Sequence, residues 1–204
     1  LLKITQELLA DASFDVHGKL ISMFTEQVGE TEEPLFIEGD GGDEPTGILN
    51  GGITNTDIST ATANTILPND IQGLPFDLTA AYRARGVWVI PRPHMKEIML
   101  LRENSDGANT GAFLWNNNWQ TGKPPQLAGY EALETEYMTA DSADGDALLF
   151  FGDLSKYTIV DRADISIQKL VELYALTGYI GLLFIKRMDA GVTDVNGFVR
   201  LNRT

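Results

Sequence analysis

The sequence predicts an α+β fold in which helices occupy the first part of the chain and long strands the last part. Three observations lead to this prediction: an apolar stripe at helical spacing over residues 16–28, a strand followed by a proline-marked helix over residues 87–102, and a series of strand-like segments after residue 146. Helices and strands that occupy separate stretches of a chain are typical of α+β architecture. With 204 residues, the chain can form one domain or two small lobes that share a core.

The first part of the chain predicts helical structure. Residues 1–10 contain helix formers, as in the approach to a helix, and Asp11 or Ser13 can cap the helix that follows. That helix is expected over residues 13–33, a length of about 30 Å at about 1.5 Å per residue. Its apolar positions recur every four residues: Val16, Leu20, Phe24 and Val28.

The middle of the chain predicts a mixed α and β lobe. Residues 53–69 indicate a loop with a short strand, and residues 70–85 a helix that contains Pro75. Residues 87–90 are β-branched and aromatic, as in a buried strand, and the prolines after them favour the start of a helix. Residues 105–126 are rich in Asn, Gly, Trp and Pro and are expected to be mostly loop.

The last part of the chain predicts strands, because apolar and β-branched residues alternate there with polar ones. The expected segments are residues 134–138, 147–151, 157–161, 165–169, 177–188 and 197–202, with an Asp-Ala-Gly turn at residues 189–191.

Composition excludes several kinds of site. The chain has no cysteine, which removes disulfides, thiol catalysis and thiolate zinc sites, and two histidines, His17 and His94, are too few for a multi-histidine metal site. No apolar run approaches the roughly 20 residues of a membrane span, and no signal segment opens the chain. We therefore expect a soluble protein without a cleaved signal.

Negative charge is concentrated in one stretch of the chain. The formal net charge is -14, and residues 20–82 hold 11 acidic residues but no Lys or Arg. Affinity for DNA or RNA comes largely from basic side chains that contact phosphates. This charge argues against tight nucleic-acid binding, although it allows the protein to enclose nucleic acid without gripping it.

Residues 38–52, EGDGGDEPTGILNGG, allow three interpretations: a phosphate loop, a cation-binding loop, or a turn. Gly42 and Gly47 have the spacing of a phosphate-binding loop, but Ile48 and Leu49 stand where Lys and Ser or Thr are needed. The cation interpretation rests on four nearby acids, although their order is not that of an EF-hand: Glu38, Asp40, Asp43 and Glu44. The turn interpretation needs only glycines, which permit unusual backbone angles, and Pro45.

Other candidate residues have simpler structural explanations. Glu134 and Glu136 would share one face of a strand, where two carboxylates could act on a glycosidic bond, but an exposed acidic strand face is the strongly favoured explanation. His94 is expected to serve packing or capping at a helix start, and His17 to be exposed on the long helix.

The three tryptophans could stack on a sugar or a base. Trp88, however, lies in the expected buried strand, while Trp115 and Trp119 flank an Asn run, so core or subunit contacts are expected for them. Because no nucleophile, base and orienting group can be nominated together, we predict that the protein is not an enzyme and assign no catalytic, cofactor-binding or metal residue.

Six segments, in order, resemble the major capsid protein of tailed bacteriophages, which has the Hong Kong ninety-seven fold. They are ITQELLADASFDVHGKLISMF, IEGDGGDEPTGIL, VWVIPRPHMKEIMLLRENSDG, QLAGYEALETEYM, FFGDLSKYTIVDRADISIQ and LLFIKRMDAGVTDVNGFVRL. The resemblance covers nearly the whole chain. It departs from the family at Glu131 and Ala132, where Pro-Val is common.

The resemblance implies a subunit with two discontinuous lobes. A peripheral lobe, residues 1–50 and 157–189, would hold a long spine helix and long antiparallel strands. An axial lobe of mixed α/β structure would hold residues 51–156 and 190–204. The N-terminal arm and the extended loop of the family have no counterpart in these residues, so no cross-linking Lys is carried over.

The resemblance also implies a function: a head protein of a tailed phage or prophage that forms hexamers and pentamers in an icosahedral shell around double-stranded DNA. Its partners would be itself and, in some members, scaffold, protease and portal proteins, with assembly in the bacterial cytoplasm and residence in the virion. The alternative from the residues alone is a cation-dependent or carbohydrate-binding module that uses the acidic turn and the loop between Trp115 and Trp119.

Overall fold

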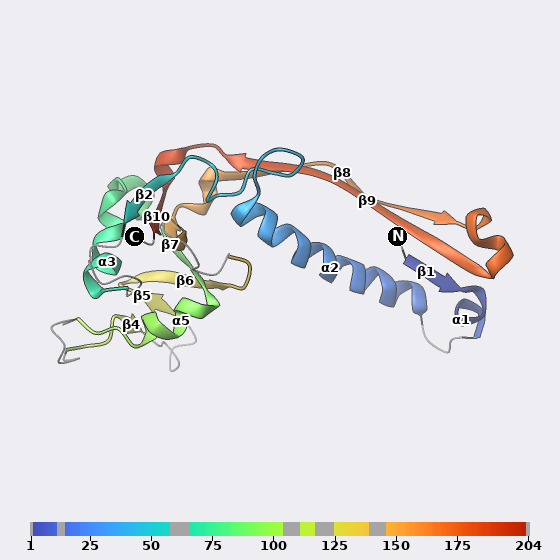
Figure 1. Ribbon diagram of the computed structural model, residues 1–204, viewed down its shortest axis with the longest axis horizontal. Coiled ribbons are helices and arrows are strands. Elements are labelled where there is room, and N and C mark those ends of the chain that lie inside the picture. Colours follow the sequence, from blue (N-terminus) through green and yellow to red (C-terminus); the bar gives the residue numbers. More distant parts are fainter. Residues whose placement is uncertain are drawn as a thin grey trace. The chain divides into compact units, whose positions relative to one another are not determined.

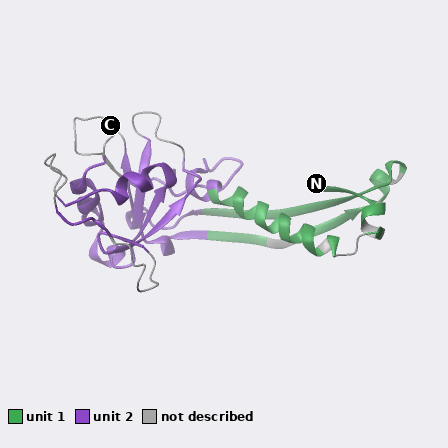
Figure 2. Cartoon of the chain, turned by 90° about the horizontal axis from the view of Figure 1, so that it is seen from below, with its two compact units in different colours: residues 1–33, 159–190 green, residues 34–158, 191–204 purple. Residues whose placement is uncertain are grey.

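The computed structural model describes residues 2–11, 15–57, 66–103, 111–116, 125–138 and 146–202. The chain divides into two compact units, shown in Figure 2. Unit 1 comprises Leu1–Glu33 and Ile159–Ala190, and unit 2 comprises Pro34–Thr158 and Gly191–Thr204. Both units combine helices with strands, which confirms the α+β prediction.

Unit 1 contains a three-stranded sheet with the strand order β1-β9-β8 (Figure 1). Its strands are β1 (Leu2–Thr5), β8 (Tyr157–Leu170) and β9 (Tyr179–Val192). Strands β1 and β9 are antiparallel, and Ile4 lies opposite Ile180, with both side chains buried. The helix α1 (Gln6–Asp11) follows β1, and the 3-10 helix η3 (Glu172–Thr177) connects β8 to β9.

The long predicted helix is α2, which spans Val16–Glu38. Its apolar stripe is confirmed: Val16 is buried, and Leu20, Phe24 and Val28 are half-buried. The cap is Asp15, not Asp11, because Asp15 Oδ1 accepts a hydrogen bond of 3.0 Å from the backbone N–H of Gly18; the other predicted cap, Ser13, lies outside the described residues. The helix runs five residues beyond the predicted end, with Pro34 inside it.

Unit 2 is built on a seven-stranded mixed sheet with the order β2-β10-β7-β3-β6-β5-β4. The strands are β2 (Thr54–Asp57), β3 (Val87–Pro91), β4 (Trp115–Asn116), β5 (Gln126–Leu127), β6 (Tyr130–Thr135), β7 (Ala147–Gly152) and β10 (Phe198–Asn202). The pairs β2–β10 and β3–β6 are parallel, and the other pairs in the sheet are antiparallel.

The single helix predicted over residues 70–85 is wrong. The structure has three short helices instead: α3 (Pro68–Gly73), η1 (Leu74–Asp77) and α4 (Ala80–Arg83). Pro75 has no backbone N–H and so cannot continue the α-helical hydrogen bonds, and the chain tightens into a 3-10 turn there. At Leu78 and Thr79 the backbone is extended before α4 begins. The predicted helix after the prolines is confirmed as α5 (Arg92–Met99).

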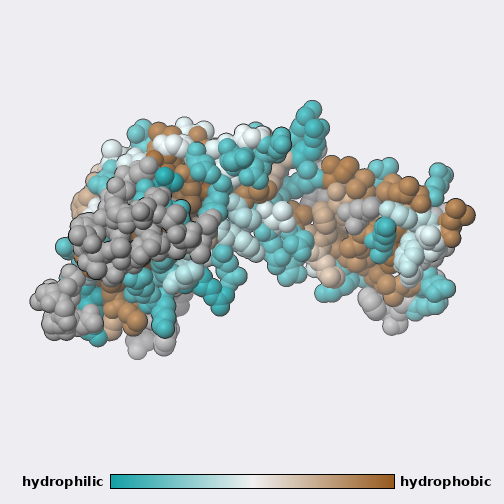
Figure 3. All heavy atoms as spheres, viewed as in Figure 1, coloured by the Kyte–Doolittle hydropathy of each residue, from teal (hydrophilic) through white to brown (hydrophobic). Residues whose placement is uncertain are grey.

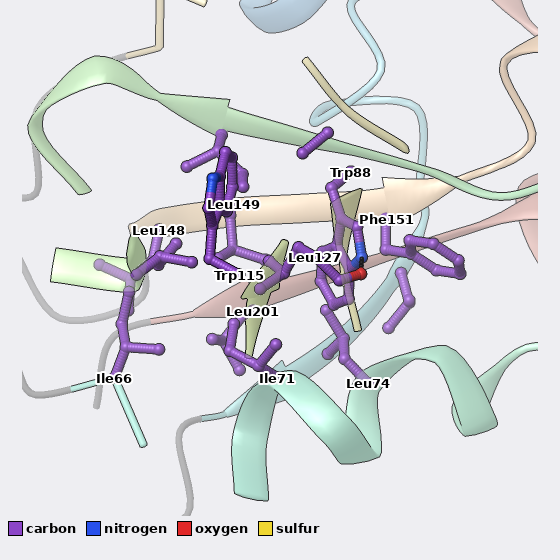
Figure 4. Close-up of a cluster of buried hydrophobic side chains, with 14 of the residues drawn as sticks. Ile66, Ile71, Leu74, Trp88, Trp115, Leu127, Leu148, Leu149, Phe151 and Leu201 are labelled. Carbon is purple, nitrogen blue, oxygen red and sulfur yellow. Dashed lines mark hydrogen bonds between the residues drawn. The ribbon is translucent and has the colours of Figure 1, made fainter. Parts of the chain in front are cut away.

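Both faces of the unit 2 sheet are buried. In β3, Trp88 and Ile90 belong to one apolar cluster and Val89 to another, as the alternation of side chains in a strand requires. Figure 4 shows the first cluster, in which Ile71 and Leu74 of α3 and η1 lie against side chains of the sheet. Because both faces are covered, the central strands are almost continuously apolar.

Three strand predictions need correction. The segments expected at residues 157–161 and 165–169 form one strand, β8, of 14 residues. The expected turn at residues 189–191 lies inside β9. The strand expected at residues 134–138 begins earlier, as β6, and ends at Thr135. In the first two cases, polar residues in long exposed strands resemble turn residues.

Candidate functional site

The acidic glycine-rich segment, residues 38–52, is a tight turn against the end of α2. The backbone N–H groups of Ile48 and Leu49 donate to the carbonyl oxygens of Phe36 and Ile37 over 2.9 and 3.0 Å. The side-chain amide of Asn50 donates to the carbonyl oxygen of Glu38 over 2.6 Å. These bonds satisfy the carbonyl groups that a helix end leaves open, so the segment completes α2.

Two glycines of this turn are required by close backbone approach. The backbone N–H of Gly47 donates to the carbonyl oxygen of Gly39 over 2.9 Å. A Cβ atom at Gly47 would lie 2.5 Å from the backbone nitrogen of Gly39 and 2.6 Å from that of Glu38. A Cβ atom at Gly42 would meet only the Asp40 carboxylate, at 3.3 Å, so of the two glycines with GxxxxG spacing only Gly47 is required by backbone packing.

Two carboxylates of the turn, those of Asp40 and Glu44, accept hydrogen bonds within it. Asp40 Oδ1 accepts a 2.8 Å bond from the N–H of Gly42, and Glu44 Oε1 accepts a 3.2 Å bond from the N–H of Asp40. Within the described residues, no group of three or more His, Cys, Asp or Glu side chains could hold a metal ion. The turn interpretation therefore accounts for this segment.

The two carboxylates Glu134 and Glu136 are not part of a catalytic pair. Glu134 lies in β6 and is exposed, whereas Glu136 lies beyond the strand end and forms an ion pair with Arg92. Between them Thr135 points into the protein and is buried. The two carboxylates therefore lie at the exposed end of the strand, in different surroundings.

The described histidine and tryptophan candidates make contacts within the fold. His94 lies near the start of α5, with Nδ1 at 3.7 Å from Glu97 Oε2. Trp88 is fully buried, and its Nε1–H donates to the carbonyl oxygen of Leu127 over 3.0 Å. Trp115 is buried in the same cluster, so it is unavailable to a sugar. Trp119 and the side chain of His17 lie outside the described part of the structure.

A polar network that the sequence did not reveal holds α4 of unit 2 in place. The hydroxyl group of Tyr82 donates to Asp194 Oδ2 over 2.5 Å, across 112 residues of sequence. The hydrogen bond from Tyr82, together with one from the N–H of Asn196, holds the pKa of Asp194 below its ordinary value. The same bond raises the pKa of Tyr82.

Next to this network, Arg85 forms an ion pair with the buried Asp153, with Nη2 and Oδ2 2.7 Å apart. Burial of Asp153 acts to raise its pKa, but hydrogen bonds from Ser155 and the charge of Arg85 outweigh it, and the pKa lies below its ordinary value. Asp153 thus stays ionised and fixes the connection between β7 and β8, which begins with the short helix η2 (Leu154–Lys156).

A second unpredicted cluster lies in unit 1, between α2 and the strands. Lys186 of β9 forms ion pairs with Glu32 of α2 and Asp161 of β8. The hydrogen bond with Glu32 raises the pKa of Lys186, despite a burial effect in the opposite direction. Nearby in sequence, Phe24 and Phe184 stack with their ring centroids 3.9 Å apart. In the sequence, the charged residue Lys186 within the apolar run of β9 is the feature that could have indicated this cluster.

Unit 1 carries most of the large apolar side chains that are exposed in the described residues. They are Leu2, Leu8, Ile21, Met23, Ile159, Val160, Ile167, Val171, Leu173, Leu176, Tyr179 and Ile185. Figure 3 shows such side chains gathered on the face of unit 1 in view. A thin layer of three strands and one long helix cannot bury all its apolar residues, and exposed apolar patches of this kind mark protein–protein contacts.

A model of the phage capsid family matches residues 1–202 of the chain. The chain belongs to the phage capsid family. Comparison with solved structures agrees. The capsid of an empty GTA particle, computed with C5 symmetry, is 26% identical, with a TM-score of 0.80 over 98% of this capsid protein and 70% of that chain. The capsid of the native GTA particle gives the same values.

Phage structures share the fold of the capsid protein at lower identity. The chain of Microbacterium phage Oxtober96 is 18% identical, with a TM-score of 0.67 over 98% of the capsid protein and 69% of that chain. That of Mycobacterium phage Ogopogo is 10% identical, with a TM-score of 0.64 over 98% and 73%. No curated protein sequence gives a significant match.

The predicted fold and function class are therefore confirmed. The protein is a major capsid structural protein of the virion, not an enzyme, and it assembles with copies of itself into shells. No described helix of the capsid protein is long and apolar enough to cross a membrane. The surfaces that matter in such a protein are those that meet other subunits, which agrees with the exposed apolar residues of unit 1.

Proposed function

We propose that the capsid protein forms hexamers and pentamers that close into an icosahedral shell around the double-stranded DNA of a tailed phage or prophage. The observation that carries this proposal is the match to the capsids of GTA particles, at 26% identity over 98% of the chain. The alternative, a cation-dependent or carbohydrate-binding module, has no supporting observation.

The two units take the two places that a shell subunit needs. We assign residues 1–50 and 157–189 to a peripheral lobe and residues 51–156 and 190–204 to an axial lobe. The compact units support a division of this kind at its later boundaries, where they break after Thr158 and Ala190, whereas residues 34–50 belong to unit 2. The thin unit 1, with its exposed apolar residues, suits contacts between subunits.

The charge of the chain suits a container for DNA. With a net charge of -14, the subunit has few basic side chains to hold phosphates, so the enclosed DNA stays free to enter and leave. Assembly in the bacterial cytoplasm, with scaffold, protease and portal proteins as further partners, completes the proposal.

Negative-stain electron microscopy of the protein, expressed alone and together with the other head proteins of its phage, tests the proposal. We expect shells, or rings and tubes made of the same hexamers. Protein that stays monomeric under both conditions, while its circular dichroism shows a folded chain, would overturn the proposal.

A further inference from the structure

The sequence contains two Asn-Gly steps, at Asn50 and at Asn196. An Asn that precedes Gly is open to deamidation, because Gly has no side chain to shield its backbone nitrogen. That nitrogen attacks Cγ of the Asn, the bond from Cγ to Nδ2 breaks, and a succinimide ring forms. Ammonia leaves with the proton that the backbone nitrogen gives up. Water then opens the ring, and the product is Asp or isoaspartate, whose main chain runs through the side chain.

The first step is closed by backbone groups. The N–H of Gly51, which would have to attack, donates to the carbonyl oxygen of Ile48 over 3.2 Å. The side-chain amide of Asn50 donates to the carbonyl oxygens of Glu38 and Gly39 over 2.6 and 3.2 Å. The attacking nitrogen and the leaving amide are therefore both held, and no side chain accepts any of these bonds.

The second step is closed by a single residue, Asp194. The N–H of Gly197 donates to the carbonyl oxygen of Asp194 over 3.1 Å. The side-chain amide and the backbone N–H of Asn196 both donate to Asp194 Oδ1, each over 3.1 Å. Asp194 is also the residue that caps the short helix η4 (Val195–Gly197). Because the side chain of Asn196 is exposed, water can reach it if these bonds open.

Asp194 is itself fixed by a residue from a distant part of the chain. The hydroxyl group of Tyr82, on α4, donates to Asp194 Oδ2. The two carboxylate oxygens thus have separate tasks, since Oδ2 binds Tyr82 and Oδ1 binds Asn196. The carboxylate is held in the position in which it restrains the amide.

The product of the reaction does not fit this place in the fold. Gly197 is buried, and even a Cβ atom there would lie 2.9 Å from Cγ of Lys156. Its carbonyl oxygen accepts a 2.9 Å hydrogen bond from the N–H of Asp153. Isoaspartate would lengthen the backbone just before Gly197, and Asp in place of Asn196 would put a second carboxylate beside Asp194.

We propose that the step from Asn196 to Gly197 is a latent deamidation site, which Asp194, supported by Tyr82, keeps closed in the folded subunit. This inference goes beyond the proposed shell function and does not depend on it. Because the reaction is irreversible, a subunit that lost this restraint would accumulate the product.

Mass spectrometry of peptides from the aged protein tests the proposal, because it follows Asn196 and Asn50 separately. The parent protein and Asp194→Ala are incubated at mildly alkaline pH, where the attacking nitrogen loses its proton more readily. We expect Asn196 to react at least about tenfold faster in the variant, because η4 opens more easily, and Asn50 to react at the parent rate. Asp43→Ala, which removes an exposed carboxylate of another turn, is the matched control and should leave Asn196 at the parent rate.

Two results would overturn the proposal. One is a folded Asp194→Ala variant that loses the amide of Asn196 no faster than the parent protein does. The other comes from the parent protein unfolded in guanidinium chloride, where both Asn residues should react quickly. If Asn196 reacts as fast in the folded parent protein as in the unfolded one, the fold does not close this step.

A second variant decides the question if Asp194→Ala fails to fold, which rapid loss of Asn50 would reveal. Asp194→Ser can still cap η4 through its hydroxyl oxygen, but it has no second oxygen to bind Tyr82. Faster loss of Asn196, with Asn50 intact, supports the proposal. Loss of Asn196 at the parent rate contradicts it.

The cost of the product can be measured on its own. Asn196→Asp should melt about 2–4 °C below the parent protein, because it loses the hydrogen bond to Asp194 and places two carboxylates side by side. Asn196→Ala loses the same hydrogen bond without adding charge and should melt above Asn196→Asp. An Asp variant that melts with the parent protein would show that the product fits, and would count against the proposal.

Discussion

The ammonium nitrogen of Lys186 lies 2.5 Å from Oε1 of Glu32, although 154 residues separate the two in sequence. Their side chains are 23% and 17% exposed, so the ion pair is largely removed from water. Asp161 Oδ1 lies 3.6 Å from the same ammonium group. One side chain therefore connects the long helix α2 to both long strands of unit 1.

Lys186→Met should destabilise unit 1 by about 1–3 kcal/mol, because Glu32 would be left largely buried without its partner. The free energy of unfolding, measured with denaturant and circular dichroism, checks this. Arg187→Met is the matched control: Arg187 is the exposed neighbour on β9, and its loss should change stability by less than about 0.5 kcal/mol. Equal effects of both variants would show that the ion pair contributes nothing specific.

Trp88→Phe should destabilise unit 2 by about 2–4 kcal/mol, since the change leaves a cavity and removes the donor to the carbonyl oxygen of Leu127. Urea unfolding followed by circular dichroism measures the change without relying on tryptophan fluorescence. The comparison is Phe76→Leu, at a side chain that is 72% exposed, where little change is expected. A Trp88 variant as stable as the Phe76 variant would mean that Trp88 does not anchor the core.

Two glycine substitutions should have opposite signs. Gly47→Ala should destabilise the turn at the end of α2 by more than about 2 kcal/mol, because the new methyl group would meet the backbone of Glu38 and Gly39. Gly29→Ala, in the exposed middle of α2 where nothing lies within 4 Å, should stabilise the protein by about 0.5–1 kcal/mol. Melting temperatures of the two variants check the prediction, and a shift in the same direction for both would contradict it.

Unit 2 should lose folding stability at low pH, because two of its carboxylates become protonated. The pKa values of Asp153 and Asp194 lie below the ordinary value of 3.8 in the folded protein. Their unfolded forms bind protons first as the pH falls, so their stabilising contribution is complete above about pH 5 and is lost as the pH falls below 4. Denaturant unfolding at several pH values between 3 and 7 should show this decline.

The variant Asp153→Asn should show a shallower decline below pH 5 than the parent protein, because the titrating group is gone while the amide can still cap η2. Asp43→Asn, at an exposed residue of the turn that follows α2, is the control and should leave the slope unchanged. A parent protein whose stability does not fall between pH 5 and pH 3 would contradict the role of these carboxylates.

Much of the fold could be predicted because it depends on local patterns. The spacing of Val16, Leu20, Phe24 and Val28 fixes the buried stripe of α2, and the apolar run at residues 87–90 gives β3. Errors arose where local signals conflict with tertiary structure. Polar residues near 162–166 suggested a break, but β8 is an edge strand of its sheet and tolerates polar residues there.

The candidate contacts could not be predicted in the same way. Lys186 meets Glu32, and Tyr82 meets Asp194, only after the chain has folded over more than 100 residues. The leucines at residues 170–176 are visible in the sequence between two strands, but only the structure shows that Leu173 and Leu176 are exposed. Patterns in a single sequence therefore predict which residues are buried better than they predict which residues contact each other.

The position of β10 in the unit 2 sheet sets the timing of folding during synthesis. This strand, residues 198–202, lies between β2 and β7 and pairs with both. The ribosome first releases residues 34–158 of unit 2, then residues 159–190 of unit 1, and only then β10. The unit 2 sheet can be completed only after this last step. Until β10 is available, β2 and β7 lack the strand that lies between them, so the sheet of a nascent subunit stays open.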